Sequence, residues 1–394
     1  MSENTFDNYQ FDDEIKRALA LLKYEIPTKV QIEVIPKVFE NRDLIVKSQT
    51  GSGKTASFGI PICQIIESDC INPQALILTP TRELATQVRD NISDIGRFKR
   101  IKTVALYGKE PISQQIEEFE QKIHIIVGTP GRLKDHIERG TFILDEIKYL
   151  IIDEADEMLN MGFLKDVEAI LTKLPIDRRT MVFSATYPKK VENICRQYMT
   201  DPINISIASE NILTNKIEQQ IIEVNEAGKI SMLKDITIVE NPDSCIIFCK
   251  TKGRVDKVFA ELEKSNYSCE KIHGSIKQND RFSVMEGFKI GNFRYLVATD
   301  VAARGIDVNN ISLVVNFDIP IEKESYVHRI GRTGRAGKTG KAISFKTPSD
   351  GENLKAIEKY IDYEIPVRVP PTTQEIVKMK NLFEKKVRGR RNGI

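Results

Sequence analysis

Residues 48–55, SQTGSGKT, have the types and the spacing needed to bind a nucleoside triphosphate. They follow an apolar run and precede a helical stretch, which is the setting of a phosphate-binding loop. Gly51 and Gly53 would let backbone N–H groups turn toward phosphate oxygens. Lys54 would reach the β and γ phosphates, and Thr55 would hold Mg²⁺. The loop residues predicted to bind the nucleotide are Ser48, Gln49, Thr50, Gly51, Ser52, Gly53, Lys54 and Thr55.

Residues 150–156, LIIDEAD, place carboxylates directly after another apolar run. Asp153 would hold Mg²⁺ through water, and Glu154 would orient and deprotonate the water that attacks the γ phosphate. A solvated acidic turn is the alternative interpretation of such a stretch taken alone. Because the stretch follows a phosphate-binding loop in the same chain, we predict the catalytic role.

Residues 328–340, HRIGRTGRAGKTG, set three arginines and a histidine among four glycines. The stretch lacks the apolar period that a buried helix or strand would show. Arg332 and Arg335 would both face the γ phosphate bound by the first half of the chain, where they would stabilise the charge that develops on its oxygens. A basic surface loop is the alternative, in which the glycines would serve no purpose. We therefore predict that hydrolysis depends on closure of the two halves.

Two sets of short apolar runs must position these motifs. In the first half DLIVKS, QALILTP, TVALYG, IHIIVGTP, YLIIDEAD and TMVFSAT alternate with helical stretches such as residues 83–95 and 163–174. In the second half SCIIFCKT, CEKIHGS, RYLVATD, LVVNFD and KAISFKT do so again. This alternation predicts an α/β fold of two mostly parallel sheets flanked by helices. RYLVATDVAARG resembles HIIVGTPGRLKD, and we expect SCIIFCKTKGRVDKV to take the place in its sheet that DLIVKSQTGSGKTAS takes in the first.

The length of 394 residues suits two domains. We expect an N-terminal domain over residues 1–208, a flexible linker over the polar residues 209–216, a C-terminal domain over 217–370 and a basic tail over 371–394. Residues 376–394 hold seven Lys or Arg and one Glu, a net charge of +6 in a chain whose total is +2. Such a tail is interpreted either as a nucleic-acid arm or as solvated charge on a frayed end.

Composition excludes several classes of protein. Apolar residues at 41% and charged residues at 29% are typical of a soluble globular protein, and no apolar run approaches the roughly 20 residues that cross a bilayer. The acidic, polar amino terminus lacks the order of a secretory signal, so we expect a cytoplasmic protein without membrane contact. No CxxC pair is present, which argues against a structural zinc site or a disulfide framework. We expect the six cysteines to be buried as small apolar residues: Cys63, Cys70, Cys195, Cys245, Cys249 and Cys269.

Seven stretches, in order along nearly the whole chain, resemble the motifs of the DEAD-box RNA helicase family. The resemblance implies two tandem RecA-like domains joined by a flexible linker. It also implies a monomeric enzyme in which RNA-stimulated ATP hydrolysis is coupled to domain closure and to local unwinding of short RNA duplexes. The stretches are SQTGSGKT at 48–55, PTRELA at 80–85, TPGR at 129–132, DEAD at 153–156, SAT at 184–186, ATDVAARGID at 298–307 and HRIGRTGR at 328–335.

The resemblance further implies how adenine is bound. KYEIPTKVQ at 23–31 is similar to the family's adenine-reading motif, in which Gln31 would pair both edges of the base. An amide carries a donor beside an acceptor, so it fits adenine and rejects guanine. Phe6 stands at the position of the family's upstream aromatic residue. The motif departs from the family at Lys23, where glycine is usual, and keeps Tyr24, Pro27 and Thr28.

Three further residues of the second half are implied by the same resemblance. His328 is similar to the family histidine that links its segment to the acidic motif and to SAT, with Ser184 and Thr186 as relays. Asp307 would reach the ribose hydroxyls, and Gly305 would allow close approach. The second half would thus complete the nucleotide site that the first half begins.

RNA is the expected second ligand, because closure by ATP alone would be a futile cycle. Short polar side chains and N–H groups at helix ends suit contacts to phosphate and sugar, which fix register without reading sequence. Aromatic residues make up 7% of the chain and tryptophan is absent, so we expect grip on the backbone and the 2′-hydroxyls rather than a stacking platform. Lys109 follows Gly108 where the family commonly has two glycines. The predicted RNA-binding residues are Thr81, Arg82, Gly108, Thr129, Arg132, Arg281, Thr299 and Arg304.

Outside the motifs, DEADEMLNMGF, ENPDSCIIFCKT and KIHGSIKQNDR are similar to the bacterial DbpA and YxiN branch of the family, which acts in ribosome assembly on ribosomal RNA. That branch carries a further C-terminal RNA-recognition domain, for which the sequence up to Ile394 offers no aromatic GFGFV-like segment. Two other functions stay open. An ATP-gated RNA clamp or scaffold would show little unwinding, and a DNA helicase would be stimulated equally by single-stranded DNA and RNA.

Overall fold

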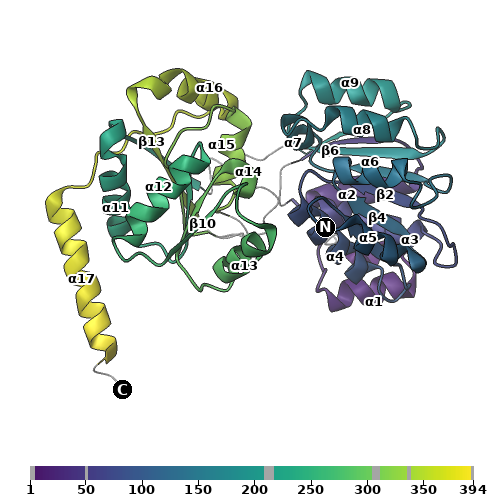
Figure 1. Ribbon diagram of the computed structural model, residues 1–394, viewed down its shortest axis with the longest axis horizontal. Helices are drawn as coiled ribbons and strands as arrows, with labels where there is room; N and C mark the ends of the chain where they lie inside the picture. Colours follow the sequence, from purple (N-terminus) through teal and green to yellow (C-terminus); the bar gives the residue numbers. More distant parts are fainter. Residues whose placement is uncertain (1–4, 49–51, 208–216, 304–310, 335–338, 392–394) are drawn as a thin grey trace. The chain divides into compact units, whose positions relative to one another are not determined.

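Two compact units, residues 1–209 and 210–394, make up the computed structural model, and each is described by itself (Figure 1). The structure describes residues 5–48, 52–207, 217–303, 311–334 and 339–391. The predicted linker at 209–216 lies outside these residues, so the predicted domain boundaries stay a prediction. Seven predicted site residues also lie outside them: Gln49, Thr50, Gly51, Arg304, Gly305, Asp307 and Arg335.

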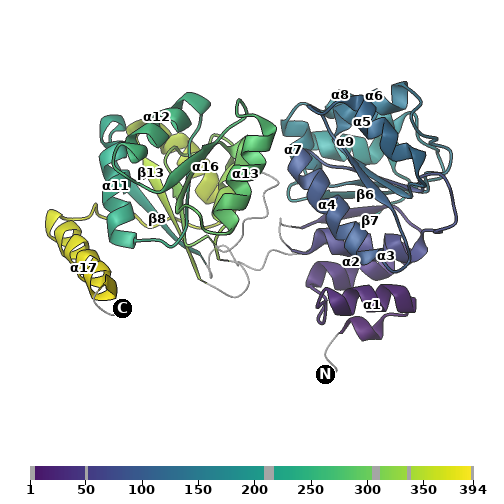
Figure 2. The same cartoon turned by 60° about the horizontal axis from the view of Figure 1, so that its bottom comes forward.

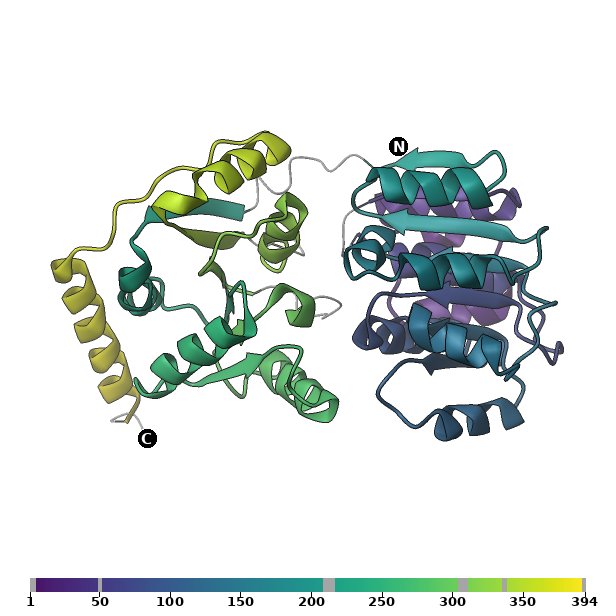
Figure 3. The same ribbon diagram turned by 45° about the horizontal axis from the view of Figure 1, so that its top comes forward.

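Unit 1 is built on a sheet of seven parallel strands in the order β3-β4-β2-β5-β6-β1-β7. Figure 3 shows this sheet from another side. Leu44, for example, pairs with Met181 on one side and with Ile203 on the other. Most strands are continuous apolar runs because both faces of the sheet are buried. The strands are β1 Leu44–Lys47, β2 Ala75–Leu78, β3 Thr103–Leu106, β4 Ile125–Gly128, β5 Tyr149–Ile152, β6 Arg179–Ser184 and β7 Ile203–Ser206.

Helices cover both faces of the unit 1 sheet (Figure 2). Because side chains alternate along a strand, Val46 and Ile77 face a core formed with α1 to α4, whereas Ile45 and Leu76 face a core formed with α6 to α9. The helices are η1 Phe6–Asn8, α1 Asp13–Leu21, α2 Lys29–Phe39, α3 Lys54–Ile65, α4 Arg82–Ile95, α5 Ile112–Glu117, η2 Glu118–Glu120, α6 Pro130–Glu138, α7 Ala155–Asn160, α8 Leu164–Leu171 and α9 Lys189–Tyr198.

Unit 2 is built on a sheet of six parallel strands in the order β10-β11-β9-β12-β13-β8. Matching β8 with β1, β9 with β2, and so on to β13 with β6 reproduces the strand order of unit 1. The two units therefore share one topology, to which unit 1 adds β7. The strands are β8 Ile217–Glu223, β9 Cys245–Phe248, β10 Cys269–Ile272, β11 Tyr295–Ala298, β12 Leu313–Asn316 and β13 Gly340–Lys346.

Both faces of the unit 2 sheet are covered as well. Ile247 and Val315 face a core formed with α11 and α12, and Ile246 and Val314 face a core formed with α13 to α16. The helices are η3 Glu226–Gly228, α11 Lys229–Glu240, α12 Lys252–Glu263, α13 Gln278–Lys289, α14 Asp300–Ala303, α15 Lys323–Ile330, η4 Pro348–Asp350, α16 Gly351–Ile361 and α17 Thr373–Arg391.

The predicted fold of two tandem RecA-like domains is confirmed, with one correction to the matching of strands. The sequence pattern misses β7, with the sequence INIS, and β8, with IEQQIIE, both at sheet edges. Because β8 takes the place of β1, SCIIFCKT in β9 takes the place of β2. The prediction that SCIIFCKT corresponds to the phosphate-loop strand is therefore wrong. The match of RYLVATD in β11 with IHIIVGTP in β4 is confirmed.

The segment after α16 runs beside β8 and then forms α17. The Ile221 N–H donates to the Pro366 carbonyl at 2.9 Å, and the Arg368 N–H donates to the Ile221 carbonyl at 2.7 Å. Within unit 2, α17 packs on α11 (Figure 1). Most of the predicted basic tail is therefore helical, which its charge alone does not reveal.

Cys63, Cys195, Cys245 and Cys249 are buried as expected, whereas Cys70 and Cys269 are only half-buried, and all six are free thiols. In the described ranges no helix is long and apolar enough to cross a membrane. Those ranges also hold no group of three His, Cys, Asp or Glu side chains arranged to bind a metal ion.

Candidate nucleotide site and nucleic-acid contacts

The phosphate-binding loop joins β1 to α3 at the carboxyl edge of the unit 1 sheet. Gly53, which directly precedes α3, has φ 94°, a backbone conformation that favours glycine. A Cβ there would lie 2.8 Å from Gln31 Nε2 and 3.0 Å from Thr28 Oγ1. Glycine is therefore required by the backbone and by the adenine motif packed against it.

Lys54 begins α3 and is buried, with 6% of its surface exposed. Its Nζ donates to the Ser48 carbonyl at 3.3 Å, and the Ser48 N–H donates to the Ser184 carbonyl at 3.0 Å. The buried Ser48 hydroxyl has no hydrogen-bond partner within the described part of the chain. Thr55 is half-buried in the first turn of α3. The lysine ammonium is thus held where β1 and β6 end.

Asp153 directly follows β5 at the same edge of the sheet and is 2% exposed. Its N–H donates to the carbonyl of Leu78, the last residue of β2, at 3.0 Å. Burial raises the pKa of the Asp153 carboxyl to about 6, while Lys54 lowers that pKa and Glu154 raises it. A carboxylate so placed fits a divalent cation, because the cation would offset the desolvation that burial imposes.

Glu154 adopts a left-handed backbone conformation, φ 52°, immediately before α7. Its N–H donates to Asp153 Oδ1 at 3.0 Å, and its side chain is half-buried. A left-handed conformation costs roughly 1 to 3 kcal/mol in a residue other than glycine, and such strain is concentrated at functional sites. The conformation agrees with the role predicted for Glu154 in activating water.

Asp156, the last residue of DEAD, binds the SAT stretch within unit 1. Its Oδ2 accepts from the Thr186 N–H and from the Thr186 hydroxyl, both at 2.8 Å. Its N–H donates to Ser184 Oγ at 3.3 Å, and the Ser184 hydroxyl donates to the Thr186 carbonyl at 2.5 Å. Ser184 and Thr186 are thus fixed to the acidic motif. Asp156 is not among the site residues predicted from the sequence, although the third carboxylate of DEAD is the signal for it.

Gln31 and Thr28 form a capping box at the start of α2. The Thr28 N–H donates to Gln31 Oε1 at 2.8 Å, and Gln31 Nε2 donates to the Gly53 carbonyl at 3.3 Å. Gln31 therefore joins α2 to the phosphate-binding loop. These bonds use one N–H and one lone pair of an amide that has two of each, and the pairing with adenine stays a prediction.

The other residues of the adenine motif lie beside this box. The Phe6 ring stacks on the Tyr24 ring with centroids 5.9 Å apart, and the Phe6 N–H donates to the Glu25 carbonyl at 3.1 Å. Phe6 and Pro27 are both buried. Lys23 has φ 59°, which explains why the family usually has glycine at this position.

Thr81, Thr129 and Gly108 stand at the carboxyl ends of three neighbouring strands of unit 1. Thr81 Oγ1 accepts from the Leu84 N–H at 3.2 Å and so caps α4. Thr129 precedes α6, and its N–H donates to the Leu106 carbonyl at 2.9 Å. A Cβ at Gly108 would meet nothing within 4 Å, so the loop after β3 is open.

Arg82 and Arg132 both contact Glu110 in the loop after β3. Arg82 Nη2 donates to the Glu110 carboxylate, and the Arg82 guanidinium lies 4.2 Å from the centre of the Tyr107 ring. Arg132 Nη2 donates to the Glu110 carbonyl at 2.9 Å. Lys109 in the same loop has φ 67°, where the family commonly has glycine. The two predicted RNA-binding arginines of unit 1 are thus brought together.

In unit 2 the described residues predicted to bind RNA are Thr299 and Arg281. Thr299 follows β11, and its N–H donates to the Ile272 carbonyl at 3.3 Å. Arg281 Nη2 donates to the Ala302 carbonyl at 3.5 Å, which links α13 to α14. Both residues therefore lie at the carboxyl edge of this sheet.

Thr251 is a further candidate RNA-binding residue, one not predicted from the sequence. It follows β9, and its Oγ1 accepts from the Arg254 N–H at 3.2 Å, so that it caps α12. Thr81 caps α4 after β2 in the same way, and β9 takes the place of β2 in unit 2. The shared topology is the signal that identifies Thr251.

The HRIGRTGR stretch is anchored by Arg329 at the end of α15. Arg329 is 2% exposed. Its Nη2 donates to Asp300 Oδ2 at 2.8 Å. Its Nη1 donates to Asn316 Oδ1 at 3.1 Å and to the Asp318 carbonyl at 2.7 Å. Arg329 therefore attaches the stretch to the carboxyl ends of β11 and β12.

His328 and Arg332 flank this anchor and are 8% and 7% exposed. The Arg332 N–H donates to the Arg329 carbonyl at 3.1 Å. A Cβ at Gly340 would clash with Thr333 Oγ1, so the start of β13 packs closely against the stretch. The backbone around Arg332 is thus fixed within unit 2.

Asp318 of unit 2 lies close to the place that Asp153 takes in unit 1: it stands two residues after β12, where Asp153 directly follows β5. Its N–H donates to the carbonyl of Phe248, the last residue of β9, at 3.3 Å. Lys229 begins α11 as Lys54 begins α3, and Lys229 Nζ donates to Asp318 Oδ1 at 2.8 Å. Unit 2 therefore has the lysine and the aspartate of a nucleotide site, bound to each other.

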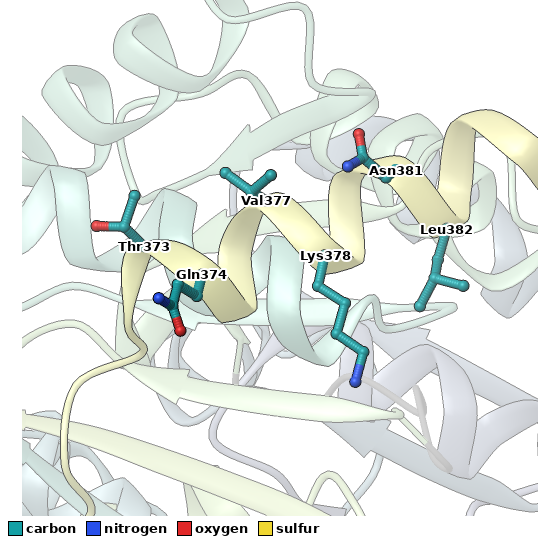
Figure 4. Close-up of a pocket in the computed structure, with 6 residues that line it drawn as sticks. All are labelled: Thr373, Gln374, Val377, Lys378, Asn381 and Leu382. Atoms are coloured by element: carbon teal, nitrogen blue, oxygen red, sulfur yellow. The ribbon is translucent and has the colours of Figure 1, made fainter.

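The helix α17 presents basic and apolar side chains on the surface of unit 2. Val377 and Leu382 are 49% and 45% exposed. Lys380 lines a separate groove together with Asp235 of α11. A groove of about 570 Å³ runs along α17 and is lined by Thr373, Gln374, Val377, Lys378, Asn381 and Leu382 (Figure 4).

The fold defines a protein with two RecA-like units, one of which carries the predicted nucleoside triphosphate site. The model of the DEAD/DEAH box helicases matches residues 28–194, and the model of the helicase conserved C-terminal domain matches residues 228–337. The chain belongs to the family of DEAD-box ATP-dependent RNA helicases.

Curated relatives and solved structures agree with this family. ATP-dependent RNA helicase DbpA of Bacillus subtilis (strain 168) is 57% identical over 385 residues, which cover 98% of this chain and 80% of the relative. DEAD-box ATP-dependent RNA helicase CshA of Geobacillus kaustophilus (strain HTA426) is 42% identical, with 94% and 79% covered. S. cerevisiae Dbp5 bound to RNA and ADP BeF3 is 29% identical, with 96% of this chain and 99% of that chain covered and a TM-score of 0.86. Mss116p bound to ssRNA and AMP-PNP is 28% identical, with 95% and 81% covered and a TM-score of 0.84.

Proposed function

We propose that this helicase hydrolyses ATP with Mg²⁺ when RNA is bound, and that closure of its two domains separates short RNA duplexes locally. One observation carries the proposal: Lys54, Asp153 and Glu154 meet at one edge of the unit 1 sheet. They combine a buried ammonium, a buried carboxylate and a glutamate in a strained conformation. Membership of the DEAD-box family supports ATP as the nucleotide.

Unit 1 binds the nucleotide and supplies the base. Lys54 fixes the γ phosphate, and Glu154 takes the proton of the attacking water. Thr55 and Asp153 would hold Mg²⁺, which would neutralise charge on the phosphate oxygens. Gln31 reads the edge of adenine, and Phe6 and Tyr24 line the base.

Unit 2 supplies positive charge on closure. Arg332 and Arg335 stabilise the charge that spreads over the γ-phosphate oxygens, while His328 connects their segment to the acidic motif. Asp307 and Gly305 approach the ribose. The pairing of lysine with aspartate in unit 2 supports this division of roles, because it leaves that unit's own site closed to phosphate.

RNA connects the two units through its backbone. The contacts in unit 1 come from the loops after β2, β3 and β4, and those in unit 2 from the loops after β9 and β11 and from α13. Because these contacts read phosphate and ribose, base preference is weak. A strand bent by such a grip cannot stay paired over more than a few bases, so unwinding is local. The contacting residues are Thr81, Arg82, Gly108, Thr129, Arg132, Thr251, Arg281, Thr299 and Arg304.

Ribosomal RNA in assembling ribosomes is the proposed physiological substrate, and the enzyme acts as a monomer. The likeness to the DbpA and YxiN branch in stretches outside the motifs supports this substrate. The basic helix α17 adds a salt-sensitive contact to RNA, since seven Lys or Arg stand against one Glu in residues 376–394.

A gel assay on a short RNA duplex tests the proposal. With ATP we expect repeated rounds of strand separation, and with a non-hydrolysable analogue at most one round per enzyme molecule. A long-lived complex with ATP and little separation would indicate an RNA clamp instead. Equal stimulation of ATP turnover by single-stranded DNA and RNA would indicate a DNA helicase.

A further inference from the structure

Gln115 in α5 is a buried amide whose hydrogen-bonding groups are all used. Its Nε2 donates to the Tyr107 carbonyl at 3.1 Å and to the Glu110 carboxylate at 3.3 Å. Its Oε1 accepts from Arg132 Nη1 at 2.8 Å and from His136 Nε2 at 3.2 Å. A primary amide offers two N–H groups and two lone pairs. Gln115, which is 2% exposed, is therefore saturated.

These partners fix the orientation of the amide. A guanidinium only donates, so the oxygen of Gln115 must face Arg132. Burial, and after it the charge of Arg132, lower the pKa of His136 to about 4, so the ring is neutral near pH 7. Its Nε2–H donates to Gln115, and its Nδ1 accepts from the Thr141 hydroxyl at 3.2 Å. Donation thus runs in one consistent direction from Thr141 through His136 to Gln115.

The same amide also reaches the second arginine of this surface. One carboxylate oxygen of Glu110 accepts from Gln115, and the other accepts from Arg82. The Glu110 carbonyl accepts from Arg132 at 2.9 Å. Arg82 begins α4 and Arg132 belongs to α6, so a single loop and one amide set the spacing of two arginines from different helices.

We propose that Gln115 is a positioning residue for RNA binding: it holds Arg132, and through Glu110 also Arg82, in the orientation that a phosphate backbone requires. The inference rests on the proposed RNA contacts of these two arginines. A preorganised guanidinium loses less side-chain entropy on binding than a mobile one. Gln115 therefore raises RNA affinity without contacting RNA or ATP.

Gln115→Met in the full chain tests this role, because methionine keeps the volume and removes both donors and acceptors. The RNA concentration for half-maximal ATP turnover, measured with a single-stranded oligonucleotide, should rise about tenfold, as for the loss of one bond to a charged group. Turnover at saturating RNA and the KM for ATP should stay near those of the parent. An unchanged RNA requirement in a folded Gln115→Met variant would overturn the proposal. Gln114→Met is the matched control, since Gln114 is an exposed neighbour in α5, and it should behave as the parent.

A double-mutant cycle with Arg132→Ala separates positioning from a general loss of structure. If Gln115 acts through Arg132, Gln115→Met should add little once Arg132 is alanine. Full additivity would refute the positioning role while leaving the RNA contact of Arg132 intact. An Arg132→Ala variant with an unchanged RNA requirement would refute the proposed RNA contact itself.

Gln115→Glu keeps the test decisive should the methionine variant fail to fold. A carboxylate still accepts from Arg132 and from His136, but it donates neither to Tyr107 nor to Glu110. RNA affinity should then lie nearer to that of the parent than to that of Arg132→Ala. A loss as large as that of Arg132→Ala would show that the acceptor side of Gln115 does not position the guanidinium.

Discussion

The two units share one strand order, yet their equivalent positions carry different chemistry. Lys54 and Lys229 each begin the helix that follows the equivalent strand, β1 or β8. Lys54 donates to a backbone carbonyl at 3.3 Å, whereas Lys229 donates to Asp318 at 2.8 Å. Asp153 is followed by Glu154 and Asp318 by a buried isoleucine. In the described part of the chain, unit 1 thus has an acidic pair directly after its strand, with Glu154 predicted to activate water, whereas unit 2 has a single acidic residue there.

Internal pairing explains this difference between the units. Around Asp318, Lys229 lies at 2.8 Å and Arg254 at 3.7 Å. Glu226 pairs with the same two cations. Two anions and two cations thus neutralise each other at the position where unit 1 has its nucleotide site. The two units share a topology and therefore an equivalent edge at which a ligand could bind. Positively charged side chains at that edge can bind phosphate only if they are not already paired with carboxylates of the same chain.

Glu154→Gln should have the largest effect on ATP turnover of the variants considered. It removes the carboxylate that follows Asp153, which unit 2 lacks after Asp318. Losing a general base costs roughly 10² to 10⁴ in rate. ATP turnover should therefore fall to the background of the assay, while RNA-dependent closure is kept, as small-angle scattering with RNA and nucleotide would detect. Glu120→Gln, at an exposed position of unit 1, should leave turnover unchanged. Ordinary turnover in Glu154→Gln would remove the assignment of the base.

Lys229→Met should mainly lower stability, whereas Lys54→Met should mainly weaken ATP binding. Removing Lys229 leaves Asp318 buried without its closest cation, which should lower the free energy of unfolding by about 3 kcal/mol while ATP affinity is kept. Removing Lys54 should abolish tight ATP binding with a smaller loss of stability. Denaturant unfolding and nucleotide titration of both variants check this. If Lys229→Met weakened ATP binding as strongly as Lys54→Met, the two lysines would not have separated in function.

Arg335→Ala tests what unit 2 contributes in place of its own site. Arginine fingers raise hydrolysis by roughly 10³ to 10⁵, so turnover at saturating RNA should fall at least about a hundredfold. Nucleotide affinity should change little, because unit 1 makes the ground-state contacts. Turnover and equilibrium binding of a fluorescent nucleotide measure the two quantities. A fall in turnover below about fivefold would exclude the finger role.

The sequence predicts the fold well because most of the motifs follow an apolar run, and such runs indicate central parallel strands. The edge strands β7 and β8 escape detection because INIS and IEQQIIE mix polar and apolar residues. The site is predicted in part. Loop residues are recognised from local spacing, but the bonds of Asp156 to Thr186 and of Lys229 to Asp318 join residues 30 and 89 positions apart. Only the strand order brings such residues together.

Protonation of His136 should lower the stability of unit 1 in acid, while Asp153 opposes this below about pH 6 because its raised pKa favours the folded state there. Burial lowers the pKa of His136 from 6.5 to about 4. Between these values the unfolded chain binds a proton that the folded chain does not, so stability falls as the pH drops below about 6.5 and the loss is complete below about 4. The loss from His136 should be about 2 kcal/mol near pH 5. When the pH is lowered, the rate of amide hydrogen exchange should rise more in β4 of unit 1 than in β9 of unit 2. The variant His136→Gln should show much less of this difference between the two strands. An equal rise in both sheets would contradict this account.

The residue types at left-handed backbone positions also differ between the two units, and the expected effect on the free energy of unfolding is smaller. Such positions in unit 1 include Lys23 at φ 59° and Lys109 at φ 67°, beside Asn41, Arg100, Glu154 and Asp201. Those described in unit 2 are Asn241, Asn266 and Asp362. Asparagine tolerates this conformation better than lysine. Lys109→Gly should therefore raise the free energy of unfolding by about 0.5 kcal/mol, the strain relieved less the entropy that glycine loses. Asn266→Gly should change it less.

RNA binding at several salt concentrations gives Lys109→Gly a second readout. If Lys109 also contacts a phosphate, its removal should reduce the salt slope of RNA binding by about one ion. Lys23→Gly is the matched control, because it relieves the same strain in the adenine motif and should leave that slope unchanged. If Lys109→Gly instead lowered the free energy of unfolding, the aliphatic part of the Lys109 side chain would have to stabilise the loop after β3 by packing. Backbone strain at Lys109 would then not distinguish unit 1 from unit 2.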